Sequence, residues 1–88
     1  MTYYYIALAT KSHAFYLEQK MRMENIQCEL AYMPREIMTD LCNMGVKIPE
    51  FELSRAASAV NRCGLPGCRF YKEIVGSVDC RYEQVVLN

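Results

Sequence analysis

Runs of apolar and aromatic residues divide this chain into short segments with the periods of strands and helices. Residues 3–9 (Tyr-Tyr-Tyr-Ile-Ala-Leu-Ala) are apolar at every position, which predicts a central strand covered on at least one face. Residues 26–32 alternate apolar with mostly polar positions and place Cys28 on the apolar face of a half-buried strand. Residues 44–48 and 82–87 predict two further short strands.

Between the strands, apolar residues recur at three- and four-residue spacing, which predicts helices. The first helix is capped by Thr10 or Ser12 and stops at Asn25. Its apolar face consists of Ala14, Leu17 and Met21. A second helix opens at Pro49 and is broken by the turn at residues 63–68. Its apolar face consists of Leu53, Ala56, Ala57 and Val60. The next apolar positions predict one or two further helical turns; they are Phe70, Tyr71, Ile74 and Val75.

The resulting order, β-α-β-β-α-β, is that of a ferredoxin-like sandwich, an α+β fold with four strands and two helices on one face. In that topology the first and third strands lie side by side in the centre. We therefore predict a single domain over residues 1–88, a ferredoxin-like βαββαβ sandwich with an extra C-terminal helical segment. The strand over residues 26–32 would lie at a sheet edge, where a partner strand or a homodimer can form.

Composition narrows the classes of function. Ten basic and ten acidic residues give zero net charge. Proteins that bind nucleic acid or an acidic membrane surface usually carry an excess of positive charge, so the composition argues against both classes. The longest apolar run is too short to span a membrane, and no signal-peptide pattern opens the chain. Five cysteines cannot all pair within one chain, so we expect mostly free thiols in a reducing, cytoplasmic compartment.

The polar connection at residues 34–45 (Pro-Arg-Glu-Ile-Met-Thr-Asp-Leu-Cys-Asn-Met-Gly) is the candidate place for chemistry. A proline at the first helical position predicts a short helix that ends at about residue 41. Cys42 follows it, and the guanidinium of Arg35 would stabilise a thiolate there. Asp40 and the negative end of the helix dipole oppose that thiolate. The alternative is a loop cysteine that packs under the sheet edge without a chemical role.

Other residues carry weaker signals. His13, in the first turn of the first helix, suits a general base or an anion contact, and a capping or surface histidine is the alternative. Cys63 and Cys68 bracket a turn that permits a reversible disulfide, and with Cys80 they offer three thiols for a metal, with His13 or Cys42 as the fourth ligand. Their spacing matches no usual zinc pattern, so we expect neither a metal nor another cofactor.

A set of segments also carries a family resemblance. They are Tyr4–Leu8, Ser12–Ala14 with Glu18, Tyr32–Ile37, Cys42, and Gly45–Ile48. Together they resemble the selenium/sulfur carrier protein-like family of small bacterial proteins, over about residues 3–60, with residues 63–88 as an extension.

The resemblance implies a carrier rather than a turnover enzyme. Such a carrier holds sulfur or selenium on Cys42 as a persulfide or selenosulfide, with Arg35 as the anion stabiliser, His13 as a further site residue, and donor and acceptor proteins as partners. Two rival functions remain open. One is a non-catalytic interaction or regulatory module that uses a sheet edge or a dimer, and the other is a metal-binding protein that uses the C-terminal cysteines.

Overall fold

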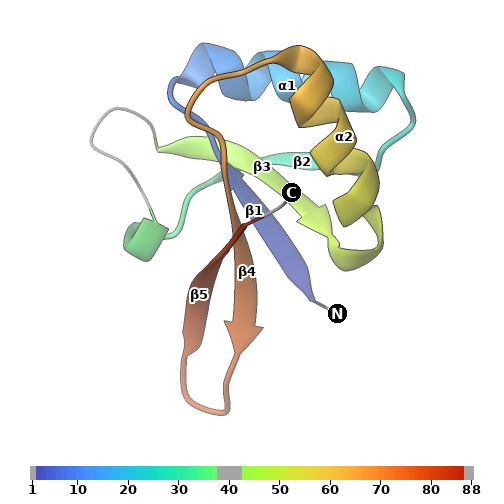
Figure 1. The fold of residues 1–88 in the computed structure, drawn as a ribbon. Helices are drawn as coiled ribbons and strands as arrows, with labels where there is room; N and C mark the ends of the chain where they lie inside the picture. Colours follow the sequence, from blue (N-terminus) through green and yellow to red (C-terminus); the bar gives the residue numbers. More distant parts are fainter. Residues whose placement is uncertain (1, 38–42, 87–88) are drawn as a thin grey trace.

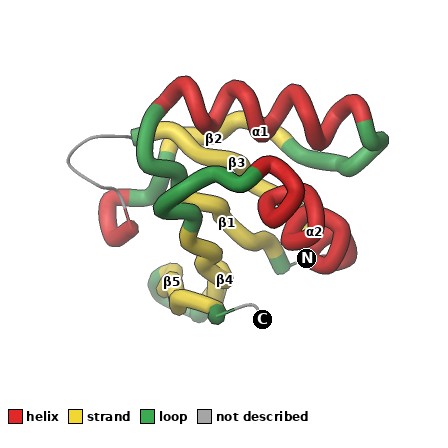
Figure 2. Tube along the Cα trace, turned by 45° about the horizontal axis from the view of Figure 1, so that its top comes forward, coloured by secondary structure: helices red, strands yellow, loops and turns green. Residues whose placement is uncertain are grey.

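The computed structural model describes residues 2–37 and 43–86. The elements in these ranges are β1 (Tyr3–Ala7), α1 (Lys11–Met23), β2 (Glu29–Tyr32), the 3-10 turn η1 (Arg35–Ile37), β3 (Met44–Pro49), the 3-10 turn η2 (Glu50–Glu52), α2 (Leu53–Cys63), β4 (Arg69–Val75) and β5 (Cys80–Val85). Within them, the strands form one five-stranded antiparallel sheet in the order β2-β3-β1-β4-β5. Figures 1 and 2 show both helices on one face of the sheet. The predicted α+β class is confirmed.

The centre of the sheet follows the prediction, and its C-terminal side does not. β1 pairs with β3, so the first and third strands are neighbours. β4 pairs with the other side of β1, and β5 adds a fifth strand outside β4. The strand order therefore differs from that of a simple four-stranded ferredoxin-like sandwich. No helix of the described residues is both long and apolar enough to cross a membrane.

The predicted C-terminal helical segment is wrong, because Arg69–Val75 forms strand β4. Phe70 faces the helices and is buried in the core, whereas Tyr71 packs on the opposite face of the sheet. Since both faces of this strand carry apolar side chains, its sequence lacks the alternation that marks a half-buried strand. Pairing with β1 on one side and β5 on the other then decides the conformation.

Other boundaries also differ from the prediction. Pro49, expected to open the second helix, is the last residue of β3, and α2 begins at Leu53 after the turn η2. β2 begins at Glu29 rather than at residue 26. Tyr32, which the alternation over residues 26–32 predicts on the same apolar face as Cys28, is 74% exposed at the sheet edge. The helix expected after Pro34 begins as the 3-10 turn Arg35–Ile37, and its remaining residues lie outside the described ranges.

Two apolar clusters lie on opposite faces of the sheet. The larger one lies under the helices and consists of Tyr4, Ile6, Leu8, Ala14, Leu17, Met21, Ile26, Val46, Ile48, Ala56, Ala59, Val60 and Phe70. Leu30 packs against it, and the predicted apolar face of the first helix (Ala14, Leu17 and Met21) is buried in it. The smaller cluster lies on the face without α-helices and consists of Tyr5, Ala7, Met33 and Ile37. The alternation of β1 residues between the two clusters follows from the two-residue period of a strand.

A buried carboxylate fixes the start of α2. Glu52 is 4% exposed and accepts a hydrogen bond of 2.6 Å from the backbone N–H of Gln27. It also pairs with Arg55 at 3.0 Å, and Arg55 donates to the carbonyl oxygen of Glu24 at 2.8 Å. These bonds connect the first turn of α2 to the connection between α1 and β2. Because both carboxylate oxygens of Glu52 have a partner, the cost of burying this charge is reduced.

Candidate functional site

Several strand ends meet at one end of the sheet (Figure 1). Ala7, the last residue of β1, pairs with Gly45 near the start of β3 and with Arg69 at the start of β4. Tyr32, the last residue of β2, pairs with Met44. The β1–α1 and α2–β4 connections, together with the two ends of the β2–β3 connection, therefore lie at this common end.

His13 and Asn43 both present an unsatisfied polar atom near this end. The N–H of His13 donates to the hydroxyl of Thr10 at 3.1 Å, which caps α1. The Nδ1 atom of the His13 ring is buried, as is the Oδ1 atom of Asn43, and neither has a hydrogen-bond partner in the described part of the chain. Since an unpaired buried polar atom is costly, these two groups are available for a partner. Asn43 directly follows Cys42, the leading candidate in the sequence, which lies outside the described residues.

The two other predicted site residues occupy opposite sides of the sheet. His13 belongs to α1, which covers the larger cluster. Arg35 belongs to η1, whose Ile37 is buried in the smaller cluster on the other face. The guanidinium of Arg35 is exposed and forms no ion pair with any residue that the structure describes. The fold therefore holds Arg35 and His13 on different faces near the end of the sheet where β3 begins.

The described cysteines differ sharply in their surroundings. Cys28 is half-buried, and its sulfur lies 3.9 Å from the carbonyl oxygen of Glu18. Burial, and then the charge of Glu18, raises the pKa of the Cys28 thiol. Burial, and then the neighbouring Cys63, raises the pKa of the Cys68 thiol to about 11. These two thiols are poor nucleophiles at neutral pH, because the thiolate is the reactive form.

The remaining described cysteines are Cys63 and Cys80. Cys63 packs against the larger cluster at the end of α2, and Cys80 is exposed at the start of β5. All four described cysteines are free. Among the residues that the structure places, no group of three or more metal-ligating side chains comes together.

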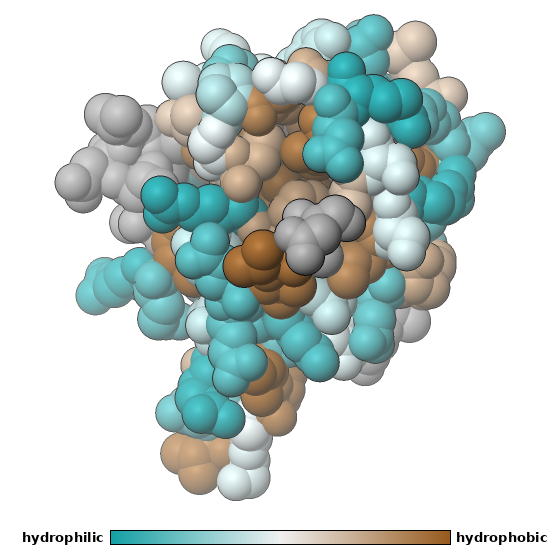
Figure 3. Space-filling view, viewed as in Figure 1, coloured by the Kyte–Doolittle hydropathy of each residue, from teal (hydrophilic) through white to brown (hydrophobic). Residues whose placement is uncertain are grey.

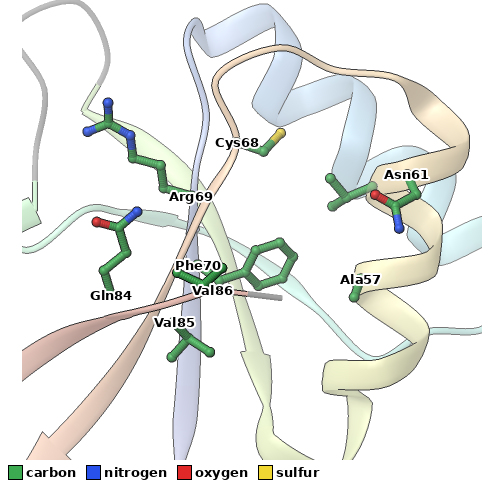
Figure 4. A pocket seen from close by; sticks show the side chains of 9 residues that line it. Ala57, Asn61, Cys68, Arg69, Phe70, Gln84, Val85 and Val86 are labelled. Atoms are coloured by element: carbon green, nitrogen blue, oxygen red, sulfur yellow. The ribbon is translucent and has the colours of Figure 1, made fainter. Parts of the chain in front are cut away.

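A cavity of about 260 Å³ lies between α2 and the strands β4 and β5. Figure 4 shows Phe70 directed toward α2, with the side chains of Arg69 and Gln84 directed the other way. The sulfur of Cys68 lies at its margin, but the pKa of that thiol is raised, so this cavity does not contain an activated nucleophile. The sheet end with His13 and Asn43 is the better candidate site.

Sequence reasoning did not identify Asn43 or Glu52 as residues of interest. Asn43 stands beside Cys42 in the sequence, and only the unpaired Oδ1 atom distinguishes it from an ordinary loop asparagine. The burial of Glu52 could not be predicted from the sequence, because it depends on a hydrogen bond from Gln27, which is distant in the chain, and on an ion pair with Arg55.

Comparison with known proteins agrees with the sequence resemblance. The chain matches the family model described as "Putative Se/S carrier protein-like" over residues 3–72. The matched region runs from β1 into β4, so it reaches further than residue 60 and contains every cysteine except Cys80. No curated protein and no solved structure matches the chain. Because the family match spans most of the chain, the protein belongs to the Se/S carrier protein-like family.

Proposed function

We propose that this protein carries sulfur or selenium on the thiol of Cys42. A carrier cysteine must form a thiolate at neutral pH and must be reachable by donor and acceptor proteins. Within the family match over residues 3–72, Cys28 and Cys68 are half-buried with raised pKa values, and Cys63 packs against the core. The unsuitability of these three is the observation that supports Cys42, the other cysteine in the matched region.

The transfer step requires no external oxidant or reductant. The Cys42 thiolate attacks the terminal sulfur of a donor persulfide, the donor S–S bond breaks, and the donor leaves as a thiolate. Cys42 then holds the persulfide, and an acceptor thiolate removes the terminal sulfur by the same exchange. With a selenium donor, the product on Cys42 is a selenosulfide.

Arg35 and His13 have complementary roles in this proposal. The exposed guanidinium of Arg35 stabilises the thiolate and the persulfide anion. The unpartnered Nδ1 of His13 accepts the proton that Cys42 loses before it attacks the donor. Asn43, the neighbour of Cys42 in the chain, provides a further polar group at the start of β3. These groups lie near the end of the sheet where β3 begins, His13 on the helix face and Arg35 on the other face, and this shared end supports the proposal.

The experiment is sulfur loading by a cysteine desulfurase with cysteine as its substrate. Intact-protein mass spectrometry should show a gain of one sulfur atom, which a reducing thiol reverses. Cys42→Ser should abolish the gain. Cys80→Ser is the matched control, because Cys80 is exposed but lies outside the family match, and it should load normally. A gain that persists in Cys42→Ser would contradict the proposal.

We also infer that the sheet is a ferredoxin-like sandwich extended by one strand. The support is the order β2-β3-β1-β4, with antiparallel pairs throughout and both helices on one face, to which β5 is added. A reducing, cytoplasmic setting in a bacterial cell fits the free thiols of the described cysteines and the carrier chemistry.

A further inference from the structure

The hairpin of β4 and β5 projects beyond the rest of the sheet (Figures 1 and 3). β1 pairs with β4 only as far as Lys72, so Glu73–Val75 and the facing residues Cys80–Tyr82 form a ribbon with no third strand among the described residues. β5 is an edge of the sheet over its whole length. A two-stranded ribbon is marginally stable in water, and an open edge strand is a template for pairing with another chain.

The hydrogen-bond pattern of the hairpin determines which β5 groups face the open edge. The N–H of Gly76 donates to the carbonyl oxygen of Asp79 at 2.7 Å and closes the turn. Hydrogen-bonded and non-hydrogen-bonded pairs alternate along an antiparallel ladder, so the next pair, Val75 and Cys80, is not hydrogen-bonded. By the same alternation, the backbone N–H and C=O groups of Cys80, Tyr82 and Gln84 point away from β4. The open edge thus offers alternate residues for a new ladder.

We propose that β5 pairs antiparallel with β5 of a second copy of this chain, with the twofold axis at Tyr82. This register places Tyr82 opposite Tyr82 of the second copy and Cys80 opposite its Gln84, so that outward-facing backbone groups meet. Both copies then share one continuous sheet. The proposal does not depend on the carrier function.

Charge distinguishes this register from its neighbours. With the axis at Tyr82, Arg81 lies opposite Glu83 of the second copy, and the twofold symmetry makes this pair twice. A shift to the next hydrogen-bonding register in either direction sets Arg81 opposite Arg81 or Glu83 opposite Glu83. Opposite charges across strands are stabilising and like charges are destabilising, so only the proposed register is favourable at both positions.

Exposed apolar residues support the same arrangement. Val78 is 94% exposed at the hairpin tip and Val86 is 78% exposed after the end of β5. The register with its axis at Tyr82 brings Val78 level with Val86 of the second copy at each end of the new ladder. Zero net charge removes the overall repulsion between two copies. The second copy therefore matches this edge in backbone polarity, in charge and in apolar surface.

Tyr82 also holds the strand in place before any partner binds. Its hydroxyl donates to the carboxylate of Glu73 at 3.4 Å, and its ring packs edge-on against Tyr5 with 5.7 Å between centroids. These contacts lie on the face without α-helices. Since β5 is already ordered, pairing with a second copy needs little further ordering.

A charge swap tests the proposal in the full-length chain. Sedimentation equilibrium should show a dimer for the natural sequence, and Arg81→Glu should weaken it about tenfold or more, because both cross-strand pairs become repulsive. The double variant Arg81→Glu with Glu83→Arg restores opposite charges and should recover most of the affinity. Lys11→Glu, an exposed charge reversal at the start of α1, is the control and should leave the dimer intact.

Glu83 also faces Lys72 within its own hairpin, whereas Arg81 faces Ile74. Arg81→Glu is therefore the cleaner single reversal. Circular dichroism during thermal unfolding, at a concentration where the chain is monomeric, should show that each variant folds. If the double variant does not fold, Arg81→Glu and the crosslink described next still decide the proposal.

A disulfide crosslink reads the register directly. Gln84→Cys places a new thiol opposite Cys80 of the second copy, and diamide should then oxidise this pair to an interchain disulfide that tryptic mass mapping identifies. Val86→Cys is the matched control, because it would meet Cys80 only in the shifted register, and it should not form that crosslink. A chain that is monomeric at all concentrations overturns the proposal. A dimer that survives Arg81→Glu, and in which the Gln84→Cys variant forms no crosslink to Cys80, also overturns it and points to another surface such as the β2 edge.

Discussion

At the scale of single residues, burial divides cysteines that look alike in the sequence. Cys28 was expected on the apolar face of a strand; it precedes β2 and is half-buried against the larger cluster. The raised pKa of the Cys68 thiol could not be predicted, because it depends on how the α2–β4 loop packs against the core. Cys42 stood out through its polar surroundings in the sequence, and its role stays a prediction.

The Cys68 thiol should make stability depend on pH in the alkaline range. Its pKa rises from 9.0 to about 11 on folding, so the folded state holds this proton more tightly than the unfolded state. The contribution is complete below about pH 9 and is lost as the pH rises toward about 11. Urea unfolding across this window should show a shallower loss of stability for Cys68→Ala than for the natural sequence. The exposed Cys80→Ala is the control, and equal slopes for all three proteins would contradict the assignment.

Gly45 should tolerate no larger side chain. A Cβ at this position would overlap the carbonyl oxygen of Ile6 and would lie 2.7 Å from the Sδ atom of Met33. Gly45→Ala should therefore lower the free energy of unfolding by about 1–3 kcal/mol, as overpacking does. Adding Met33→Ala should not rescue it, because the Ile6 carbonyl belongs to the central strand and cannot move aside. Chemical denaturation of both variants measures this, and a full rescue would show that only the methionine opposes the new methyl group.

The larger cluster depends on Leu17, which lies on the buried face of α1 and is fully buried. Leu17→Ala should cost about 2–5 kcal/mol of unfolding free energy, because the cavity it leaves cannot collapse completely. Phe15→Ala on the same helix is the control, since Phe15 is 53% exposed, and it should change stability by about 0.5 kcal/mol or less. Equal losses for the two variants in urea unfolding would contradict the assigned core.

At the scale of elements, the sequence predicts well wherever one face of an element is apolar and the other polar. α1 satisfies this condition: its buried residues are the predicted Ala14, Leu17 and Met21. β4 does not, because Phe70 and Tyr71 pack on opposite faces, and the same spacing therefore also fitted a helix. The distinction lies in long-range pairing with β1, which a local pattern does not contain.

The contact of Glu52 with Gln27 and Arg55 should stabilise the packing of α2 against the α1–β2 connection. Glu52→Ala removes the acceptor for the Gln27 N–H and the partner of Arg55, so it should cost about 1.5–3 kcal/mol. Glu50→Ala, an exposed residue in the same turn, is the control and should be nearly neutral. Thermal unfolding of the two variants decides this, and similar midpoints would show that the buried carboxylate contributes little.

At the scale of the whole molecule, the order of the first elements and the pairing of β1 with β3 follow from the sequence. The closing strand was also expected, but it is β5, and the place beside β1 belongs to β4. The smaller cluster on the face without α-helices was not foreseen, because Met33 and Ile37 reach it from the segment between β2 and β3, whose packing the local sequence pattern does not specify. That cluster holds η1 against the sheet, and so keeps Arg35 near the end where the proposed site lies.

The central claim is that one cysteine out of five receives the carried atom. The most direct test is to load the natural chain with sulfur from a desulfurase, block all thiols and persulfides with an alkylating reagent, and locate the added sulfur by peptide mass mapping. The account predicts one added sulfur, on the peptide that contains Cys42, with Cys28, Cys63 and Cys68 unloaded. Sulfur on Cys80, or spread evenly over the cysteines, would contradict a dedicated carrier thiol at Cys42.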